Sequence, residues 1–264
     1  MANFKQQVMV YAVAMLLLLP IRAFSGEVPE PDLMELLEQA PNQQQDISLS
    51  DLFRLVRDEQ IPGTKARKRL IELLAAAREK YYQSGGTDAL RADWYFPVSG
   101  YDIKAITGGR KHGYIARGYD FYAGNRHGGH PSLDIFIHDR NRDRRDDRSG
   151  EQVKIISVTS GVVVSAEDHW EEGSGLRGGK YLWVYDPGND LLVYYAHNEK
   201  LLLKVGDMVR PGDALAIMGR SGLNAAKKRS PTHLHLTVIK VNGGRMKPLD
   251  FYQSLKSAKL FTAG

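Results

Sequence analysis

From Trp94 onward, apolar residues come in short runs that are separated by turn-forming residues. Short apolar runs bounded by Gly, Pro, Asn and Asp are typical of β-strands. Two of the intervening segments, Asp-Pro-Gly-Asn at 186–189 and Arg-Pro-Gly-Asp at 210–213, have strong turn chemistry. The runs predict strands over 152–159, 162–166, 181–185, 191–196, 214–218 and 234–241. Many short strands with regular turns predict a mainly β, antiparallel sandwich or barrel.

Before Trp94, the apolar residues follow helical spacing instead. One short helix is predicted over 32–39, and Ser48 with Asp51 resembles a capping box at the start of a second. Thr64 opens a longer helix with an apolar stripe. We interpret this part either as a packing arm or as a segment that shields a cleft. The predicted organisation is a helical N-terminal region over 27–90 followed by a β domain over 91–255.

Residues 1–25 resemble a secretory signal peptide. Lys5 gives a positive start, a nearly unbroken apolar run follows, and small residues at Ala23 and Ser25 predict cleavage after Ser25. The apolar run is short for a bilayer span, so an uncleaved N-terminal membrane anchor is the alternative. In both cases the rest of the chain is predicted to be extracytoplasmic, in a periplasm or secreted.

The composition narrows the chemistry. Cysteine is absent, which excludes disulfides, thiolate metal sites and a cysteine nucleophile. Any metal must therefore be held by His, Asp and Glu, a donor set that suits zinc. The formal charge of +5 favours an anionic partner, although loss of Lys5 and Arg22 with a signal peptide would lower it to about +3. Aromatic residues do not interleave with a basic stripe, so we do not expect a nucleic-acid partner.

A pair of histidines stands in the last predicted strand. His233 and His235 are two residues apart, so on a strand their side chains share one face. Leu234 and Leu236 point to the other face and can pack on a core. In a strand of this kind, one histidine can bind a metal and the second can take part in catalysis. Because many histidines are only structural, the interpretation depends on partners elsewhere.

Two further segments carry such partners. His130 and Asp134 follow a glycine-rich approach at 125–129 and can converge on one cation if the backbone turns between them. With one histidine of the later pair they would complete a zinc set that leaves a coordination position free for water. His197 ends the strand that contains Tyr194 and Tyr195, and as a third arm of the site it would handle a proton.

These segments occur in the order found in a known family. The order is His130-x-x-x-Asp134, Tyr195-Ala196-His197, Val205-Gly206-Asp207-Met208-Val209-x-Pro211-Gly212, Gly219-x-Ser221-Gly222 and His233-Leu234-His235. It resembles the lysostaphin/LytM-type zinc metallopeptidases, which are bacterial peptidoglycan endopeptidases, over roughly 94–252. Biotinyl- and lipoyl-carrier domains share the 205–212 stretch, but the modifiable lysine beside methionine that such carriers present does not appear here.

The resemblance implies a fold and a set of roles. It implies a mixed antiparallel sandwich of the barrel-sandwich-hybrid type with a groove over the sheet. It implies that His130, Asp134 and His235 bind one Zn²⁺ per chain, and that His197 and His233 are the catalytic histidines. A zinc ion lowers the pKa of its water and polarises the scissile carbonyl. Which of the two catalytic histidines is the general base is left open.

The loop at 138–150 departs from the family, in which this connection is usually short. Asp139, Asn141 and Asp143 alternate as at the start of a calcium loop. However, Arg144 stands where an EF-hand requires glycine, and no glutamate occupies the twelfth position. A solvated, self-neutralising loop is therefore the main interpretation. A second, Ca²⁺-type ion and a wall of the substrate groove are the alternatives.

The favoured hypothesis is an exported zinc metallo-endopeptidase that hydrolyses peptide crosslinks of peptidoglycan. The main alternative is a catalytically inactive LytM-like domain that binds and activates another wall hydrolase. Since such relatives lack some ligands and this chain keeps all five polar positions, the enzyme is preferred. An exported protease with a substrate outside the wall is a third hypothesis. No motif chooses between D-alanyl–diamino acid crosslinks and glycine-rich bridges, or indicates an oligomeric state.

Overall fold

The computed structural model describes residues 47–108 and 110–261. The predicted signal peptide or anchor over 1–25 and the predicted helix over 32–39 lie outside the described residues. Within the described ranges, no helix combines the length and apolar character needed to span a bilayer.

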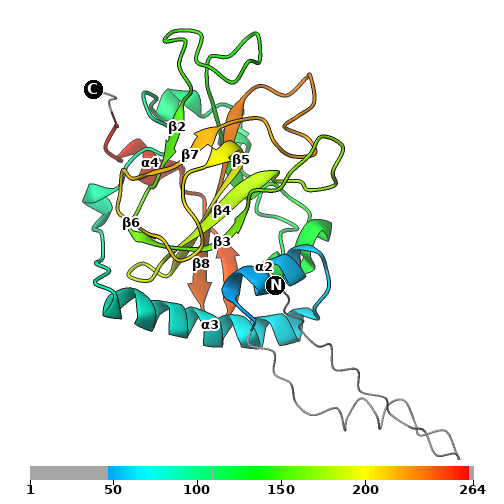
Figure 1. Ribbon diagram of the computed structural model, residues 1–264, viewed down its shortest axis with the longest axis vertical. Helices are drawn as coiled ribbons and strands as arrows, with labels where there is room; N and C mark the ends of the chain where they lie inside the picture. The colour runs from blue at the N-terminus through cyan, green and yellow to red at the C-terminus, as the bar shows by residue number, and fades with distance from the viewer. Residues whose placement is uncertain (1–46, 109, 262–264) are drawn as a thin grey trace, which may run out of the picture. The chain divides into compact units, whose positions relative to one another are not determined.

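The described β part is a single antiparallel sheet of nine strands, which confirms the predicted fold class (Figure 1). The strands are β1 (Ser132–Phe136), β2 (Lys154–Ile156), β3 (Gly161–Glu167), β4 (Lys180–Asp186), β5 (Leu191–Leu201), β6 (Met208–Val209), β7 (Ala214–Met218), β8 (His233–Asn242) and β9 (Arg245–Pro248). The main path runs β1-β8-β5-β4-β3-β6, β2 pairs with β7, β7 also pairs with β5, and β9 pairs with β8. The apolar pattern does not predict β1, β6 and β9, because β1 is interrupted by Asp134, β6 has two residues and β9 is half exposed.

The helices precede and flank the sheet. They are α2 (Leu49–Arg57), α3 (Gly63–Gln83), α4 (Tyr252–Lys256) and the 3₁₀ helices η1 (Arg91–Asp93), η2 (Ile103–Ala105), η3 (Arg110–Gly113) and η4 (Phe121–Arg126). The predicted capping box is confirmed, since the Asp51 N–H donates to Ser48 Oγ over 3.0 Å and the Ser48 N–H donates to the Asp51 carboxylate. It satisfies donors that a helix start leaves unpaired.

Each face of the sheet packs on its own core. One face buries residues such as Leu182, Leu236 and Ile135 against β2, β7 and the segment that follows η1. The other face buries Trp183 and Ile239 beneath α2, α3 and η4. Figure 1 shows α2 and α3 beside one end of the sheet. The helical region and the sheet therefore share a core, and the part of this second face that the helices leave uncovered is available for a site.

Phe53 on α2 anchors the helices to the sheet. Its ring is 4% exposed and meets the rings of Phe121 and Trp183 edge-on, with centroids 5.4 Å and 5.5 Å away. We expect Phe53→Ala to lower the free energy of unfolding by about 3–5 kcal/mol, measured by chemical denaturation, because it leaves a cavity. Ile71→Ala on α3, at a position that is 46% exposed, should cost less than about 1 kcal/mol. Equal losses in the two variants would contradict this packing.

Candidate metal centre

Three side chains converge on the uncovered face because of the strand register. Asp134 on β1 lies directly opposite His235 on β8, so the two side chains share a face. The distance from Asp134 Oδ1 to His235 Nδ1 is 3.0 Å, and the distance to His233 Nε2 is 3.9 Å. Both histidines of the pair therefore point to the same carboxylate, as the alternation of side chains along a strand predicts.

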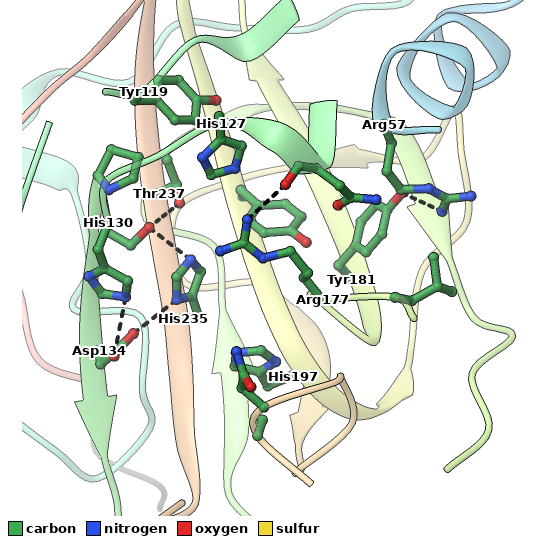
Figure 2. Close-up of a pocket in the computed structure, with 18 of the residues that line it drawn as sticks. Arg57, Tyr119, His127, His130, Asp134, Arg177, Tyr181, His197, His235 and Thr237 are labelled. Atoms are coloured by element: carbon green, nitrogen blue, oxygen red, sulfur yellow. Dashed lines mark hydrogen bonds and ion pairs between the residues drawn. The ribbon is translucent and has the colours of Figure 1, made fainter. Parts of the chain in front are cut away.

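His130 reaches the same carboxylate from outside the strand. Its backbone pairs with Ile115 in both directions at 2.8 Å, and its Nε2 lies 3.4 Å from Asp134 Oδ2 (Figure 2). The preceding Gly129 has a φ of +74°, and a Cβ there would lie 2.6 Å from the carbonyl oxygens of Ile115 and Arg117. Only glycine fits this close approach. The glycine-rich approach is thus what allows the chain to present His130 to Asp134.

The donor set has the chemistry that zinc requires. One ligand atom each from His130, Asp134 and His235 lies within 4.8 Å of the others. His130 Nδ1 donates to the Gly113 carbonyl over 3.1 Å, which leaves Nε2 as a free donor to a metal. His235 Nε2 bonds Ser132 Oγ over 2.8 Å, which leaves Nδ1 free instead. Two neutral nitrogens, each on a ring whose other nitrogen is held by a hydrogen bond, together with one carboxylate fit a three-ligand zinc site.

The electrostatics of the site keep the carboxylate charged. Burial raises the pKa of Asp134, but hydrogen bonds from His130 and His235 outweigh this effect and hold that pKa well below its usual range. The same hydrogen bond to Asp134 raises the pKa of His130, against the opposing effect of burial. In the absence of a metal, a proton on His130 thus supplies the positive charge that the Asp134 carboxylate favours.

The affinity for a metal should therefore decrease as the pH is lowered. The pKa of His130 lies above its ordinary value of 6.5, whereas Asp134 stays ionised, so a metal must displace a proton from His130 once the pH falls below that raised pKa. From this group alone we expect the zinc association constant to fall by about tenfold per pH unit there. Competition with a chelator between pH 8 and pH 5 measures the effect. A flat affinity across that range would contradict the proposed role of His130.

Ser132 positions His235 from behind. Its hydroxyl lies between His235 Nε2 and Thr237 Oγ1, and the three groups form a chain of hydrogen bonds. Groups that orient a metal ligand in this way typically contribute about 10–100-fold to affinity. We expect Ser132→Ala to weaken zinc binding by that factor in calorimetry. Ser149→Ala, in an exposed loop, serves as the control. Unchanged affinity in Ser132→Ala would show that His235 does not need this support.

His197 is aimed at the site by a bulge in β5. Lys180 and Leu182 on β4 pair with Asn198 and Tyr195 on β5, so β5 holds one more residue between these pairs than β4 does. At the bulge His197 adopts a φ of +70°, which few non-glycine residues adopt. Its Nδ1 donates to the Ser221 carbonyl over 2.8 Å. The bulge and this hydrogen bond together turn the imidazole toward His233 and His235.

His197 and His233 are suited to accept protons. Their ring centroids are 4.9 Å apart, and His233 Nδ1 donates to the Pro231 carbonyl over 2.8 Å. Because a carbonyl only accepts hydrogen bonds, Nδ1 carries the hydrogen in both rings and Nε2 keeps a lone pair. Burial lowers the pKa of His197 well below its ordinary value, and burial also lowers that of His233. Both imidazoles are therefore neutral near pH 7.

The five residues line a cleft of about 430 Å³. Its walls also contain residues that the sequence did not single out as functional, namely Phe53, Val56 and Arg57 of α2, with Tyr119, His127, Arg177 and Tyr194. In Figure 2, Tyr119 and His127 lie above the group formed by His130, Asp134 and His235, and Arg57 lies at the right of the view. The helical region thus forms part of the cleft. No sequence signal marks these residues, because their relation to the site depends on packing between distant segments.

The charged loop at 138–150 does not line this cleft. The Asp139 carboxylate accepts hydrogen bonds from the backbone N–H groups of Asp143 and Arg144 and from Thr232 Oγ1. Asn141 Oδ1 also accepts from the Asp143 N–H, over 3.2 Å. These contacts attach the loop to the segment that precedes β8. A calcium ion bound by Asp139, Asn141 and Asp143 stays a prediction.

The fold and the donor set together define a β-sheet domain with a cleft whose side chains could hold a metal ion. Residues 146–248 match the family described as Peptidase family M23. This match confirms the resemblance to lysostaphin/LytM-type peptidases. The matched range contains His197, His233 and His235, whereas His130 and Asp134 precede it.

Individual relatives match over shorter stretches. The chain is 31% identical over 97 residues to the lipoprotein NlpD/LppB homolog of Pseudomonas aeruginosa, and 33% identical over 97 residues to the murein hydrolase activator NlpD of Escherichia coli. Each match covers 37% of this chain, and the chain spans only 28% and 22% of the length of these relatives. Among solved structures, the catalytic domain of lysostaphin from Staphylococcus simulans is 22% identical with a TM-score of 0.37, over 55% of this chain and 90% of that one.

Proposed function

We propose that the chain is an exported zinc metallo-endopeptidase that hydrolyses peptide crosslinks of peptidoglycan. The observation that carries the proposal is the arrangement around Asp134, where a three-ligand donor set adjoins two neutral histidines in one cleft. A purely structural metal site is usually closed by a fourth protein ligand, whereas a catalytic one leaves a position open. His130, Asp134 and His235 are the proposed ligands, and one zinc per chain is expected.

The residues around that set support peptide hydrolysis. A zinc ion bound there would polarise the scissile carbonyl and lower the pKa of the attacking water. The Nε2 lone pair of His197 or His233 accepts the proton that this water loses. The resulting imidazolium carries an Nε2 hydrogen, which it returns to the leaving amine. Its Nδ1 hydrogen stays bonded to the backbone carbonyl behind it, so the ring keeps its orientation during both transfers.

The second histidine has a complementary role. At rest, both Nε2 atoms have a lone pair that can accept a hydrogen bond, so the imidazole that does not take the proton orients the attacking water. The division of these roles between His197 and His233 is left open, because both are buried and both are anchored in the same way. Protonation of either ring outside the reaction would remove the acceptor. Their lowered pKa values keep it available at neutral pH.

The proposed substrate and location rest on the family and the relatives. Two curated relatives carry names that refer to a lipoprotein and to murein hydrolase activation, which favours an extracytoplasmic protein that acts at the wall. The test is digestion of purified peptidoglycan beside a generic unfolded protein, with release of new amino termini as the readout. Cleavage of wall peptide alone supports the proposal. Cleavage of both would favour a general exported protease.

A second candidate is a non-catalytic activator of another wall hydrolase. The observation that favours it is the name of the Escherichia coli relative, a murein hydrolase activator. To separate the two, the protein is added to a wall amidase on purified peptidoglycan, and both amidase products and new peptide termini are measured. The enzyme proposal predicts new termini without the amidase. Stimulation of the amidase without any new termini would favour the activator.

A further inference from the structure

Arg177 lies beside the proposed catalytic histidines, in the connection between β3 and β4. The carbonyl of the next residue, Gly178, accepts the backbone N–H of His197 over 3.0 Å. The carbonyl of the preceding residue, Leu176, accepts the backbone N–H of Leu223 over 2.9 Å. Arg177 is thus held on both sides by backbone bonds, one of them to His197 itself. These two hydrogen bonds fix the backbone of Arg177 at the cleft, although the residue lies in a loop.

The guanidinium is directed into the cleft. Its Nη1 donates to the Asn125 carbonyl of η4 over 3.2 Å, and Figure 2 shows the group on the side where His127 and His235 lie. Arg177 is also close enough for its positive charge to help lower the pKa of His127, after the larger effect of burial. A guanidinium has five N–H donors. One bond to Asn125 therefore leaves most of them available to a ligand.

The charge of Arg177 lacks a carboxylate partner within the described residues. The other arginine of the cleft, Arg57, is bound by Asp58 at 2.7 Å and by Glu167 at 2.9 Å. Asp134 is the single carboxylate that lines the described cleft, and it belongs to the proposed metal set. An arginine held beside a metal site without an acidic partner is suited to bind an anionic group of a ligand.

We propose that Arg177 binds a substrate carboxylate next to the scissile bond, and so selects crosslinks through a diamino diacid over glycine-rich bridges. A diamino diacid keeps a free carboxylate on the carbon that bears the crosslinked nitrogen. A glycine bridge has no such group near its peptide bonds. The inference rests on the proposed function and adds the substrate class that the motifs leave open.

The test uses two synthetic crosslink peptides that differ only in this carboxylate, which is free in one and amidated in the other. We expect the wild-type protein to prefer the free acid, and Arg177→Gln to lower kcat/KM for it by about 10- to 100-fold. The ratio between the two peptides should then approach one. Arg177→Lys keeps the charge but loses the planar fork, so it should be intermediate.

Arg245→Gln is the control, because it removes one positive charge from an exposed position on β9 outside the cleft. It should leave the preference within about twofold of wild type. If Arg177 only tied the two cleft walls together through Asn125, its loss would slow both peptides equally and the ratio would not change. That result would overturn the inference while cleavage itself still supported the proposed function.

If the wild-type protein cut neither peptide, the proposed function would fail and the inference would be judged by binding. Calorimetry with the same two peptides then replaces the rate measurement. Tighter binding of the free acid that is lost in Arg177→Gln would retain the carboxylate site in a non-catalytic domain. Equal binding of the two peptides would overturn it.

Discussion

His197→Ala is expected to lower kcat/KM for hydrolysis of wall peptide by about 100- to 10,000-fold while zinc content stays at about one per chain. His197 is not among the three residues whose ligand atoms converge. Its Nε2 either takes the proton or orients the attacking water in the proposed mechanism, and alanine has no atom that can accept a hydrogen bond in its place. Zinc analysis and kinetics on one preparation separate the two effects.

The matched control is His169→Ala, which removes an exposed histidine outside the cleft. It should change neither zinc content nor kcat/KM. Because His197 is buried and sits at a bulge, the melting temperature of each variant is recorded alongside. Full activity in a folded, zinc-loaded His197→Ala protein would remove His197 from the mechanism and leave His233 as the base.

Asp134→Asn should weaken zinc binding by more than about 100-fold, beyond the loss expected from a residue that only supports a ligand. The change keeps the shape of the side chain but removes the negative charge that faces the cation. It also replaces the charged acceptor that raises the pKa of His130 by a neutral amide. A second readout does not need zinc. The pKa of His130, measured by NMR in the metal-free protein, should fall toward its ordinary value.

The control for this variant is Asp168→Asn, at an exposed carboxylate that pairs with Lys180 at 3.4 Å. Zinc affinity and the pKa of His130 should be unaffected there. Unchanged zinc affinity in Asp134→Asn would mean that the carboxylate is not a ligand. A lowered pKa of His130 in the same experiment would then assign Asp134 a purely positioning role.

Part of the site could be predicted from local sequence because strand alternation is a local property. The two-residue spacing of His233 and His235 puts both on one face, and the structure places both beside Asp134. The glycines before His130 signal a close backbone approach, which Gly129 provides. Most of the sheet was predictable for the same reason. The short strands β6 and β9 were not, because their few, half-exposed residues give no clear alternation.

The rest depends on contacts between segments that are distant in the sequence. The bulge that orients His197 arises from the pairing of β4 with β5, and no turn residue marks it. His235 presents Nδ1 as its proposed ligand atom because its Nε2 is bonded to Ser132, which lies on the neighbouring strand β1. Likewise, α2 reads as an ordinary amphipathic helix, and only its packing on Trp183 and Phe121 makes it a wall of the cleft.

The most direct measurement of the central claim is zinc content by elemental analysis of the wild-type protein and His130→Ala, on samples also assayed for release of new amino termini from purified peptidoglycan. We predict about one zinc per wild-type chain with peptide cleavage, and loss of both in His130→Ala, because two ligands rarely hold zinc. A wild-type protein that binds no zinc and releases no termini would contradict the account and favour the activator.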